Sequence, residues 1–323
     1  MVRGKRVLIT GGAGFIGCHV AGRLARDNEI TLLDINLNNA LPYSPLATDA
    51  TVRKIEGDVR DAALVQDEVA RADIVLHYAS LIGVREVIEN ARATIDTIVV
   101  GTNNVLDAAR RNKSIERLMY ISTSEVYGNI VNAMEGASAS IGTDNDPRLC
   151  YASAKLMGEH QVWAYHRDYG LPTVIIRPFN IFGPRRKAAH ALGVFIVKAL
   201  AGTDITVHGD GSQLRSWCYI EDFCDGIIGC LEKDAAIGQD YNLGNPVTAS
   251  TIYDLASRII RLTNSASRIV TTPHSYTDIG VRAPNSLKAS EQLGYLPKFD
   301  MDAALPPTIA WYGEHLDDFT HWR

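Results

Sequence analysis

The stretch STSEVYG, residues 122–128, combines hydroxyl groups with one carboxylate directly after the apolar run RLMYI, residues 117–121. The run predicts a buried strand, so Thr123, Ser124 and Glu125 stand where that strand leaves the core. Hydroxyl groups can hydrogen-bond a polar ligand, and a carboxylate can exchange a proton during a reaction. A strand-end turn alone would explain a serine here, but not a threonine, a glutamate and a later Tyr–Lys pair together.

A second reactive pair lies in the sequence YASAK, in which Tyr151 and Lys155 are four residues apart. In a helix this spacing places both side chains on one face. An ammonium beside a phenol lowers the pKa of the phenol, so Tyr151 could act as a base on a sugar hydroxyl. Such pairs often arise by chance and are then solvated. The place of this pair, after a glycine-rich turn and a hydroxyl cluster, favours the catalytic interpretation.

The octapeptide TGGAGFIG, residues 10–17, follows the first predicted strand and begins the first predicted helix. Gly11, Gly14 and Gly17 have the spacing G-x-x-G-x-x-G, and small residues let a backbone approach a pyrophosphate closely. The pyrophosphate would then lie at a helix N-terminus, whose N–H groups are unpaired. A tight strand-to-helix turn without a ligand is the alternative.

Two aspartates follow at the ends of the second and third predicted strands. Asp34, twenty residues after Gly14, could accept hydrogen bonds from both ribose hydroxyls of an adenosine and would repel a 2′-phosphate. NAD is therefore favoured over NADP. Asp58 could bind the adenine amino group, although as an isolated residue it would be expected to cap the helix that begins in RDAALVQDEV.

Short apolar runs alternate with longer helical segments along the first half of the chain. Such runs are typical of strands that are covered on both faces. Strands are predicted at residues 6–10, 29–34, 52–58, 73–79, 117–122 and 173–178, and helices at 14–27, 62–71, 88–112 and 151–169. The alternation predicts an α/β fold, with a doubly wound parallel sheet of the Rossmann type and helices on both faces.

The rhythm changes after Pro178, where short turns separate helical segments. Helices are predicted there at residues 191–201, 221–234, 251–263 and 302–315. We expect a smaller, mixed α/β C-terminal lobe that covers the carboxyl edge of the sheet, where open α/β sheets bind ligands. The predicted boundaries assign residues 1–178 and 218–245 to a dinucleotide-binding domain, and residues 179–217 and 246–323 to a substrate lobe.

The composition is that of an ordinary globular protein, with 46% hydrophobic and 21% charged residues among 323. The net charge is −5 and the basic residues are scattered, so no nucleic-acid surface is expected. No apolar run approaches about 18 residues, so no membrane span is expected. The cysteines show no metal-ligand spacing, which predicts no metal site and reduced thiols in a cytoplasmic protein. They are Cys18, Cys150, Cys218, Cys224 and Cys230.

Together these segments resemble the extended short-chain dehydrogenase/reductase family, which includes nucleotide-sugar epimerases, dehydratases and decarboxylases. The resemblance covers nearly the whole chain, through TGGAGFIG, GDVRD, HYAS, STSEVYG, YASAK, RPFNIFGPR, GDGSQLRSW, YNLGN and LGYLP. It implies an NAD-dependent enzyme in which Thr123 hydrogen-bonds the C4 oxygen of a sugar. Tyr151 would be the base, and Lys155 would tune it and hold the nicotinamide ribose.

The triplet Thr-Ser-Glu at residues 123–125 resembles that of the UDP-glucuronic acid decarboxylases. Simple 4-epimerases have no acid at the position of Glu125, and glucose 4,6-dehydratases resemble Thr-Asp-Glu. PRLCY, residues 147–151, and RAPNSLKA, residues 282–289, also resemble the decarboxylases, with Asn285 in place of an aspartate. GDP-mannose dehydratases share Thr-Ser-Glu, but their ribose site resembles that of NADP-binding proteins.

The resemblance implies NAD-dependent decarboxylation of a nucleotide-linked glucuronic acid, either UDP-glucuronate or dTDP-glucuronate. Oxidation at C4 would turn the C6 carboxylate into a β-keto acid, which loses CO2 and is then protonated at C5. The product would be a 4-keto-pentose, a nucleotide-linked xylose, or both. A 4-epimerase or 4,6-dehydratase on the same scaffold is the alternative. A cofactor-binding sensor without turnover is a third hypothesis, and the intact Thr–Tyr–Lys set argues against it.

The remaining roles come from this chemistry and from the same resemblance. Glu125 is expected to protonate C5, alone or through Ser124 and water, with a solvated strand-end carboxylate as the alternative. Arg282 is the best candidate to hold the departing carboxylate, and Arg85 is a poorer one. The predicted catalytic set is Thr123, Ser124, Glu125, Tyr151, Lys155 and Arg282.

Asn180 and Arg215 match family residues that contact the diphosphate, and an arginine fork suits that group. His208 would flank the base, or else be an exposed strand residue. The predicted substrate set is Arg85, Glu125, Asn180, Arg185, Val194, Lys198, His208, Arg215 and Arg282. The predicted cofactor set is Gly11, Gly14, Phe15, Ile16, Gly17, Asp34, Asn36, Asp58, Val59, Tyr78, Ala79, Ser80, Ser122, Tyr151, Lys155 and Phe179.

Two segments depart from the family pattern. Ile98 stands where relatives often have Asn, and HYASLIGVRE, residues 77–86, is more similar to epimerases and dehydratases. The latter segment lines the sugar in the family, so it leaves the identity of the sugar open. Relatives pair two helices from each subunit, and the apolar positions in residues 95–109 and 156–165 would suit a homodimer built through a four-helix bundle.

Overall fold

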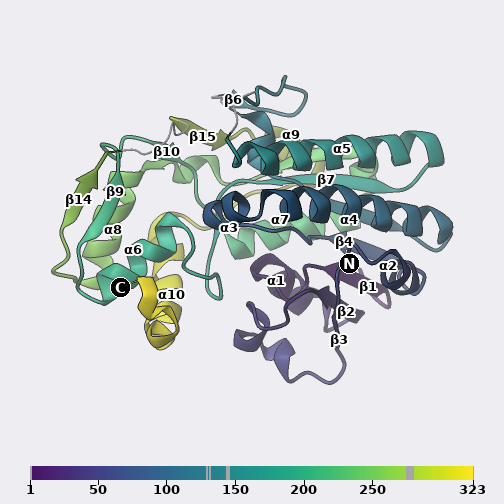
Figure 1. Cartoon of the computed structure of the whole chain (residues 1–323), viewed down its shortest axis with the longest axis horizontal. Helices are drawn as coiled ribbons and strands as arrows, with labels where there is room; N and C mark the ends of the chain where they lie inside the picture. Colours follow the sequence, from purple (N-terminus) through teal and green to yellow (C-terminus); the bar gives the residue numbers. More distant parts are fainter. Residues whose placement is uncertain (1, 129, 131, 143–145, 274–279, 323) are drawn as a thin grey trace.

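The computed structural model describes residues 2–128, 130, 132–142, 146–273 and 280–322. Its centre is a seven-stranded sheet in the order β12-β7-β5-β4-β1-β2-β3, in which all neighbours are parallel (Figure 1). The strands are β1 (Arg6–Thr10), β2 (Glu29–Asp34), β3 (Arg53–Glu56), β4 (Ile74–His77), β5 (Arg117–Ile121), β7 (Thr173–Pro178) and β12 (Gln239–Leu243). The predicted parallel sheet is confirmed, and β12 is an additional strand.

Helices cover both faces of this sheet because successive residues of each strand point to opposite sides. Leu8 and Val75 belong to an apolar cluster with residues of α2, α4 and α5. Val7 and Leu76 belong to a second cluster, with residues of α1 and α7. The helices are α1 (Phe15–Leu24), α2 (Ala62–Val69), α4 (Ala91–Arg111), α5 (Leu149–Tyr169) and α7 (Ile220–Glu232). The prediction of a doubly wound sheet is therefore confirmed.

The helix predicted at residues 88–112 is two helices, α3 (Val84–Glu89) and α4, which meet at Asn90. Asn90 has φ −129° and ψ 41°, and its side-chain amide donates to the backbone carbonyl and the carboxylate of Glu86. A polar side chain that bonds the preceding turn competes with helical hydrogen bonding. The prediction of one helix was wrong because the helical periodicity continues across this break.

Strand β12 is an edge strand with the sequence QDYNL, whose polar residues obscure the apolar pattern expected of a strand in a parallel sheet. Asn242 is fully buried, and its side chain bonds Tyr127 and two backbone carbonyl groups. Asp240 forms ion pairs with Arg177 and Lys288. The polar residues of β12 therefore have long-range partners, which no local pattern indicates.

The C-terminal part of the chain forms a smaller mixed α/β lobe, on the left of Figure 1. Its four-stranded sheet has the order β13-β10-β15-β6 and contains parallel and antiparallel pairs. The strands outside the central sheet, among the described residues, are β6 (Asn132–Ala133), β8 (Ile181–Phe182), β9 (Ile205–His208), β10 (Leu214–Arg215), β11 (Cys218–Tyr219), β13 (Ser250–Thr251), β14 (Ile269–Thr272) and β15 (Val281–Pro284). The helices are α6 (Ala191–Leu200), α8 (Ile252–Thr263), α9 (Leu287–Leu293), which was not predicted, and α10 (Met301–Glu314).

Short 3-10 helices connect several of these elements. They are η1 (Leu41–Tyr43), η2 (Pro45–Ala47), η3 (Ser124–Tyr127), η4 (Asp234–Ala236), η5 (Pro246–Thr248) and η6 (Leu316–Trp322). Among the helices in the described ranges, none combines the length and the apolar character needed to cross a membrane. The five cysteines are free thiols, as predicted, and four of them are buried.

Helix α5 packs directly on the sheet at Gly158. A Cβ atom there would overlap the phenolic oxygen of Tyr120, a residue of β5 that is 1% exposed. Replacement Gly158→Ala should therefore push α5 away from β5 and lower the free energy of unfolding by about 1–3 kcal/mol. Thermal denaturation would measure this loss.

The matched control is Gly22→Ala, because Gly22 is an exposed residue of α1 with open space at its Cβ position. This variant should keep or slightly raise the melting temperature, since alanine has the higher helix propensity. Equal melting temperatures for the two variants would contradict the overlap at Tyr120.

Candidate active site

The hydroxyl cluster forms a buried turn at the carboxyl end of β5. Ser122, Thr123 and Ser124 are 2%, 7% and 5% exposed, and η3 begins directly after Thr123. The Thr123 hydroxyl oxygen accepts a 3.2 Å hydrogen bond from the Glu125 backbone N–H, which caps this short helix. The stretch is therefore a strand-end turn, and its chemical capacity depends on which side chains face it.

Helix α5 brings Tyr151 to this turn. The phenol interacts with the hydroxyl groups of Thr123 and Ser80 and with the charge of Glu125. Burial, together with the negative charge of Glu125, raises the pKa of Tyr151, and the two hydroxyl groups oppose this shift. The fold thus brings together a phenol, two hydroxyls and a carboxylate from three separate segments.

Lys155 lies one helical turn after Tyr151 and is 1% exposed. Its ammonium donates a 2.8 Å hydrogen bond to the Ile121 carbonyl and lies 5.1 Å from the centre of the Tyr120 ring. Burial lowers the pKa of Lys155 to about 7, and the charge of Glu159 opposes this shift. The expected lowering of the pKa of Tyr151 by the ammonium is wrong for this structure, because desolvation of the phenol dominates and the lysine donates elsewhere.

The depressed pKa of Lys155 makes stability depend on pH. Between about pH 7 and the ordinary lysine value of 10.5, the unfolded chain binds more protons at this residue than the folded chain. The free energy of unfolding should therefore rise with pH across this interval, measured without cofactor. In Lys155→Met this contribution disappears. The free energy of unfolding of the wild type should therefore rise relative to that of the variant as the pH rises.

Urea denaturation at both ends of the interval measures this effect. Lys113→Met is the control, because Lys113 is exposed and its ammonium donates a 3.4 Å hydrogen bond to the Arg110 carbonyl, away from the sheet. An identical pH dependence of Lys155→Met and the wild type would show that Lys155 is not desolvated as the structure indicates.

Glu125 forms an ion pair with Arg282, with 3.4 Å between Oε1 and Nη1. The Glu125 side chain is 42% exposed and that of Arg282 is 16% exposed, so the carboxylate meets solvent while the guanidinium is largely enclosed. Arg282 is in register with Arg215 on the neighbouring parallel strand β10. Residues in register lie on the same face of a sheet, so two arginines stand side by side there.

The residues predicted to bind the diphosphate meet near this pair of arginines. The Asn180 amide donates to the Ser216 carbonyl at 2.8 Å, and the Ser216 N–H donates to the Arg282 carbonyl at 3.2 Å. Asn180 has φ +43°, a left-handed conformation that its short polar side chain tolerates. Asn180 and Arg282 therefore both bond Ser216, the residue that follows Arg215.

Other residues predicted to bind the substrate have local partners instead. The Arg85 side chain is 88% exposed and pairs with Glu89 at 2.7 Å on α3. The Lys198 ammonium donates to the Asp204 carbonyl at 3.1 Å. Within the described part of the chain, neither residue forms a hydrogen bond or ion pair with the predicted catalytic residues. The rest of the set lies in the C-terminal part: Arg185 at a left-handed loop position, Val194 in α6 and His208 at the end of β9.

The turn after β1 forms a glycine-lined entry to α1. Gly11 has φ +68°, and a Cβ atom there would come within 2.8 Å of the Ala79 backbone nitrogen. A Cβ atom at Gly17 would lie 2.6 Å from the Gly11 carbonyl oxygen. Gly14 precedes α1 without a side-chain cap, and the first turn contains no acidic residue. The N–H groups of this turn are therefore suited to a diphosphate.

Asp34 ends β2 beside this entry. Its carboxylate accepts hydrogen bonds from the backbone N–H groups of Ala13 at 3.0 Å and Asn36 at 3.1 Å. Burial raises the pKa of Asp34, and these hydrogen bonds oppose the shift. The carboxylate is thus fixed at the strand end, where a ribose would lie in a sheet of this topology.

The turn after β3 lies at the same edge of the central sheet as the turns after β1 and β2. Asp58 pairs with Arg60, with 2.9 Å between Oδ2 and Nε. The interpretation of Asp58 as a helix cap is wrong, because Asp61 accepts hydrogen bonds from two N–H groups at the start of α2. Sequence reasoning missed Asn104, whose amide donates to the carbonyls of Val59 and Arg60 at 3.0 and 3.1 Å.

The last group of predicted cofactor residues follows β4 and β5. The Ala79 N–H donates to the Thr10 hydroxyl at 3.3 Å, and the Ser80 hydroxyl donates to the Leu81 carbonyl at 3.1 Å. The Ser122 hydroxyl is buried and has no hydrogen-bond partner within the described ranges. An unpartnered buried hydroxyl is costly, which favours a ligand there. Buried apolar side chains complete the group: Val59, Tyr78 and Phe179.

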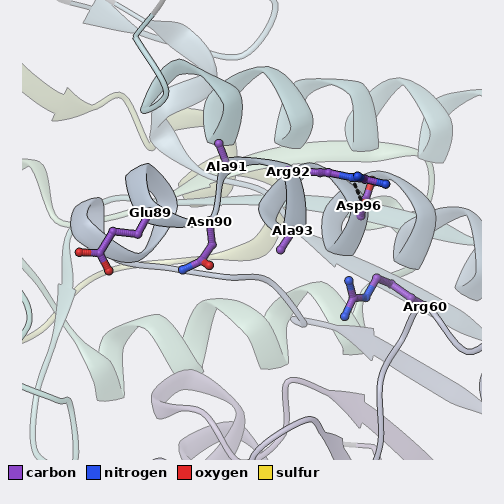
Figure 2. A pocket seen from close by; sticks show the side chains of 7 residues that line it. All are labelled: Arg60, Glu89, Asn90, Ala91, Arg92, Ala93 and Asp96. Carbon is purple, nitrogen blue, oxygen red and sulfur yellow. Dashed lines mark ion pairs between the residues drawn. The ribbon is translucent and has the colours of Figure 1, made fainter.

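A surface hollow of about 480 Å³ lies where α3 meets α4 (Figure 2). It is lined by Arg60, Glu89, Asn90, Ala91, Arg92, Ala93 and Asp96. Figure 2 shows Arg92 and Asp96 side by side, and their ion pair spans 3.6 Å. Because Arg60 also pairs with Asp58, the hollow has little unbalanced charge, and none of the predicted catalytic residues lines it.

A parallel sheet with a glycine-lined helix entry, a carboxylate at the end of β2 and a Thr–Tyr–Lys set is typical of dinucleotide-dependent enzymes. Residues 7–244 match the NAD dependent epimerase/dehydratase family. The chain belongs to this family, and its cofactor is NAD. The open glycine entry and the fixed carboxylate of Asp34 fit that cofactor.

Known relatives include two kinds of enzyme. A UDP-N-acetyl-alpha-D-glucosaminuronate decarboxylase from Bacillus cytotoxicus is 34% identical, over 97% of this chain and 99% of the relative. A dTDP-glucose 4,6-dehydratase from an Actinoplanes species is 31% identical, over 95% and 97%. A solved double mutant of the Streptomyces venezuelae dTDP-glucose 4,6-dehydratase with NAD bound has a TM-score of 0.87 at 28% identity, covering 98% of this chain and 100% of that chain. Similarity alone therefore supports both reactions.

Proposed function

We propose that the protein uses NAD to decarboxylate a nucleotide-linked hexuronic acid. The observation that supports this most is the ion pair between Glu125 and Arg282 beside Tyr151. A proton donor and a cation that can bind a carboxylate then lie next to one base, as a uronic acid substrate requires. UDP-glucuronate and dTDP-glucuronate are candidate substrates, and the Bacillus cytotoxicus relative adds UDP-N-acetylglucosaminuronate.

The first step is oxidation of the C4 hydroxyl. Thr123 would hold the C4 oxygen, and Tyr151 would remove the hydroxyl proton. Bound NAD supplies the acceptor for the C4 hydride. Because burial raises the pKa of Tyr151, the phenol needs help to ionise. We propose that the Lys155 ammonium turns from the Ile121 carbonyl toward the phenol and the nicotinamide ribose when the site is loaded.

The second step breaks the C5–C6 bond. CO2 leaves, and the electron pair of this bond passes into the enolate of the new C4 ketone. Thr123 and Tyr151 would hydrogen-bond the enolate oxygen. A proton from solvent would then reach C5 through Glu125, directly or by way of Ser124 and water. Return of the hydride and of a proton to C4 would give a nucleotide-linked xylose when the sugar is glucuronate. Release before this return would give the 4-keto-pentose and leave the cofactor reduced.

The other proposed contacts follow the arrangement of the two lobes, residues 1–178 with 218–245 and residues 179–217 with 246–323. Arg282 would bind the carboxylate before it leaves, and Asn180 and Arg215 would bind the diphosphate. NAD would be held by the α1 entry, by Asp34 at the ribose and by Asp58 at the adenine. Further NAD contacts are proposed for Phe15, Ile16, Asn36, Val59, Tyr78, Ala79, Ser80, Ser122 and Phe179.

A 4,6-dehydratase or 4-epimerase is the second candidate. The dehydratase relatives and the segment at residues 77–86 favour it. Ser124 argues against dehydration, because the glucose 4,6-dehydratases resemble Thr-Asp-Glu, with an acid at that position. Ser124 is 5% exposed and cannot supply the acid that eliminates water.

Mass spectrometry of the products separates these reactions. The protein with NAD would be incubated in parallel with UDP-glucuronate, dTDP-glucuronate, UDP-N-acetylglucosaminuronate, UDP-glucose and dTDP-glucose. We expect loss of CO2 from at least one uronate and no reaction with the two glucose derivatives. Loss of water from a glucose derivative without CO2 from any uronate would establish a dehydratase, and an unchanged mass with altered stereochemistry would establish an epimerase.

We also propose a homodimer formed through α4 and α5. Ile95, Val100 and Met157 are 42%, 44% and 52% exposed on these adjacent helices, so an apolar surface is left for a second copy. Sedimentation should show twice the monomer mass, and a monomer would contradict this proposal. The free thiols suit a reducing compartment, and we propose that the protein acts in the cytoplasm.

A further inference from the structure

A buried network of charges and hydrogen bonds runs behind the catalytic cluster. Arg177 of β7 is 7% exposed and donates to both carboxylate oxygens of Glu159, at 2.8 and 2.5 Å. Its Nη1 atom donates to Asp240 at 2.7 Å and to the Tyr127 hydroxyl at 2.8 Å. One guanidinium therefore joins α5, β12 and η3.

Tyr127 extends this network toward the smaller lobe. Its hydroxyl donates to Asn242 Oδ1 at 2.9 Å, and burial raises the pKa of Tyr127 to about 12, so the phenol keeps this proton. Asn242 Nδ2 donates to the carbonyls of Ala133 at 3.1 Å and Asn285 at 3.2 Å. The Asn242 side chain thus uses its acceptor and both donor positions.

Each end of the network lies in a segment that carries a group of the proposed reaction. Glu159 lies one helical turn after Lys155 on α5. Tyr127 ends η3, the short helix that contains Glu125. Asn285 directly follows β15, the strand of Arg282. Because an unsatisfied buried polar group is costly, these bonds restrict how the three segments can move relative to one another.

We propose that Tyr127 and Asn242 are positioning residues, which hold Glu125 and Arg282 in place relative to Tyr151. This inference rests on the proposed function, in which oxidation at C4 depends on Thr123, Tyr151 and Lys155. Loss of CO2 and protonation at C5 also require Glu125 and Arg282. A weakened network should therefore slow the second step more than the first.

The test variant is Tyr127→Phe, which removes only the hydroxyl that joins Arg177 to Asn242. The matched control is Tyr241→Phe, because Tyr241 is fully buried in β12 and donates to Gln292 at 2.7 Å, outside the network. In single-turnover experiments, the absorbance of reduced nicotinamide reports C4 oxidation, and trapped CO2 reports the second step. Tyr127→Phe should lower the rate of CO2 release relative to oxidation by about ten- to a hundredfold, as expected for misplaced groups. Tyr241→Phe should leave this ratio unchanged.

Amide hydrogen exchange gives a second readout that requires no substrate. In Tyr127→Phe, exchange should become faster at residues 124–128 and 281–285, and in Tyr241→Phe it should not. If Tyr127→Phe fails to fold, Asn242→Asp is the second variant. It keeps the acceptor for Tyr127 but loses both donors, so the same changes are expected.

The outcomes separate this inference from the proposed function. Unchanged exchange in both segments, or changed exchange with an unchanged rate ratio, would overturn the positioning role while decarboxylation stands. If the wild type releases no CO2 from any uronate, the proposed function fails. The exchange experiment then decides the positioning role by itself, and faster exchange in Tyr127→Phe would support it.

Discussion

Tyr151→Phe should lower kcat by about 10²- to 10⁴-fold and leave substrate binding nearly unchanged. The phenol lies beside Thr123, Ser80 and Glu125, where it can take the proton from a C4 hydroxyl, and phenylalanine cannot. Without this step the C4 ketone does not form, so CO2 release should stop as well. The rate of product formation by mass spectrometry and the affinity by calorimetry measure the two effects.

Tyr165→Phe is the control for this prediction. Tyr165 lies near the C-terminal end of the same helix, almost four turns after Tyr151, and donates to Asp107 of α4 at 2.8 Å. It should retain wild-type turnover. If Tyr151→Phe turned over within a few-fold of the wild type, another residue would have to be the base.

Glu125→Gln should separate oxidation from the later steps. The amide keeps the size of the side chain but cannot deliver a proton to C5, and it removes the ion pair that orients Arg282. We expect product formation to slow by about 10²-fold or more, while C4 oxidation is retained. Absorbance of reduced nicotinamide in a single turnover measures oxidation, and deuterium incorporation at C5 in heavy water measures protonation.

Two further variants sharpen this result. Ser124→Ala should slow C5 protonation only if the proton passes through Ser124, so it separates the direct route from the relayed one. Glu89→Gln removes an exposed carboxylate, 52% exposed and paired with Arg85, and should behave as the wild type. Wild-type protonation at C5 in Glu125→Gln would remove Glu125 from the proposed mechanism.

Local sequence patterns were sufficient for much of this protein. The strands at residues 6–10 and 29–34 were predicted with the bounds that the structure shows, because a central parallel strand needs an uninterrupted apolar run. The glycines of the α1 entry were recognisable because only glycine allows such close backbone contacts. The spacing of Tyr151 and Lys155 placed both on one helix face because a helix repeats about every 3.6 residues.

The partners of polar side chains could not be predicted, because they come from distant parts of the chain. Arg282 meets Glu125 across 157 positions of sequence, and Asn242 bonds Tyr127 across 115. The bond of Asn242 and the ion pairs of Asp240 satisfy the polar side chains of β12, which is an edge strand of the sheet. The residues that form these long-range bonds lie in stretches of sequence that resemble ordinary turns and surface positions.

The amino-acid sequence by itself thus determined the parallel sheet, the dinucleotide entry and the residue types of the reaction, since each depends on local periodicity or spacing. Only the tertiary structure decided the ionisation of these residues and their relative placement. The phenol of Tyr151 and the ammonium of Lys155 share a helix face, yet burial raises the pKa of one and lowers that of the other. Glu125 of STSEVYG is a candidate acid from its sequence context, but only folding sets Arg282 beside it, and its distance from the base depends on packing that no single segment encodes.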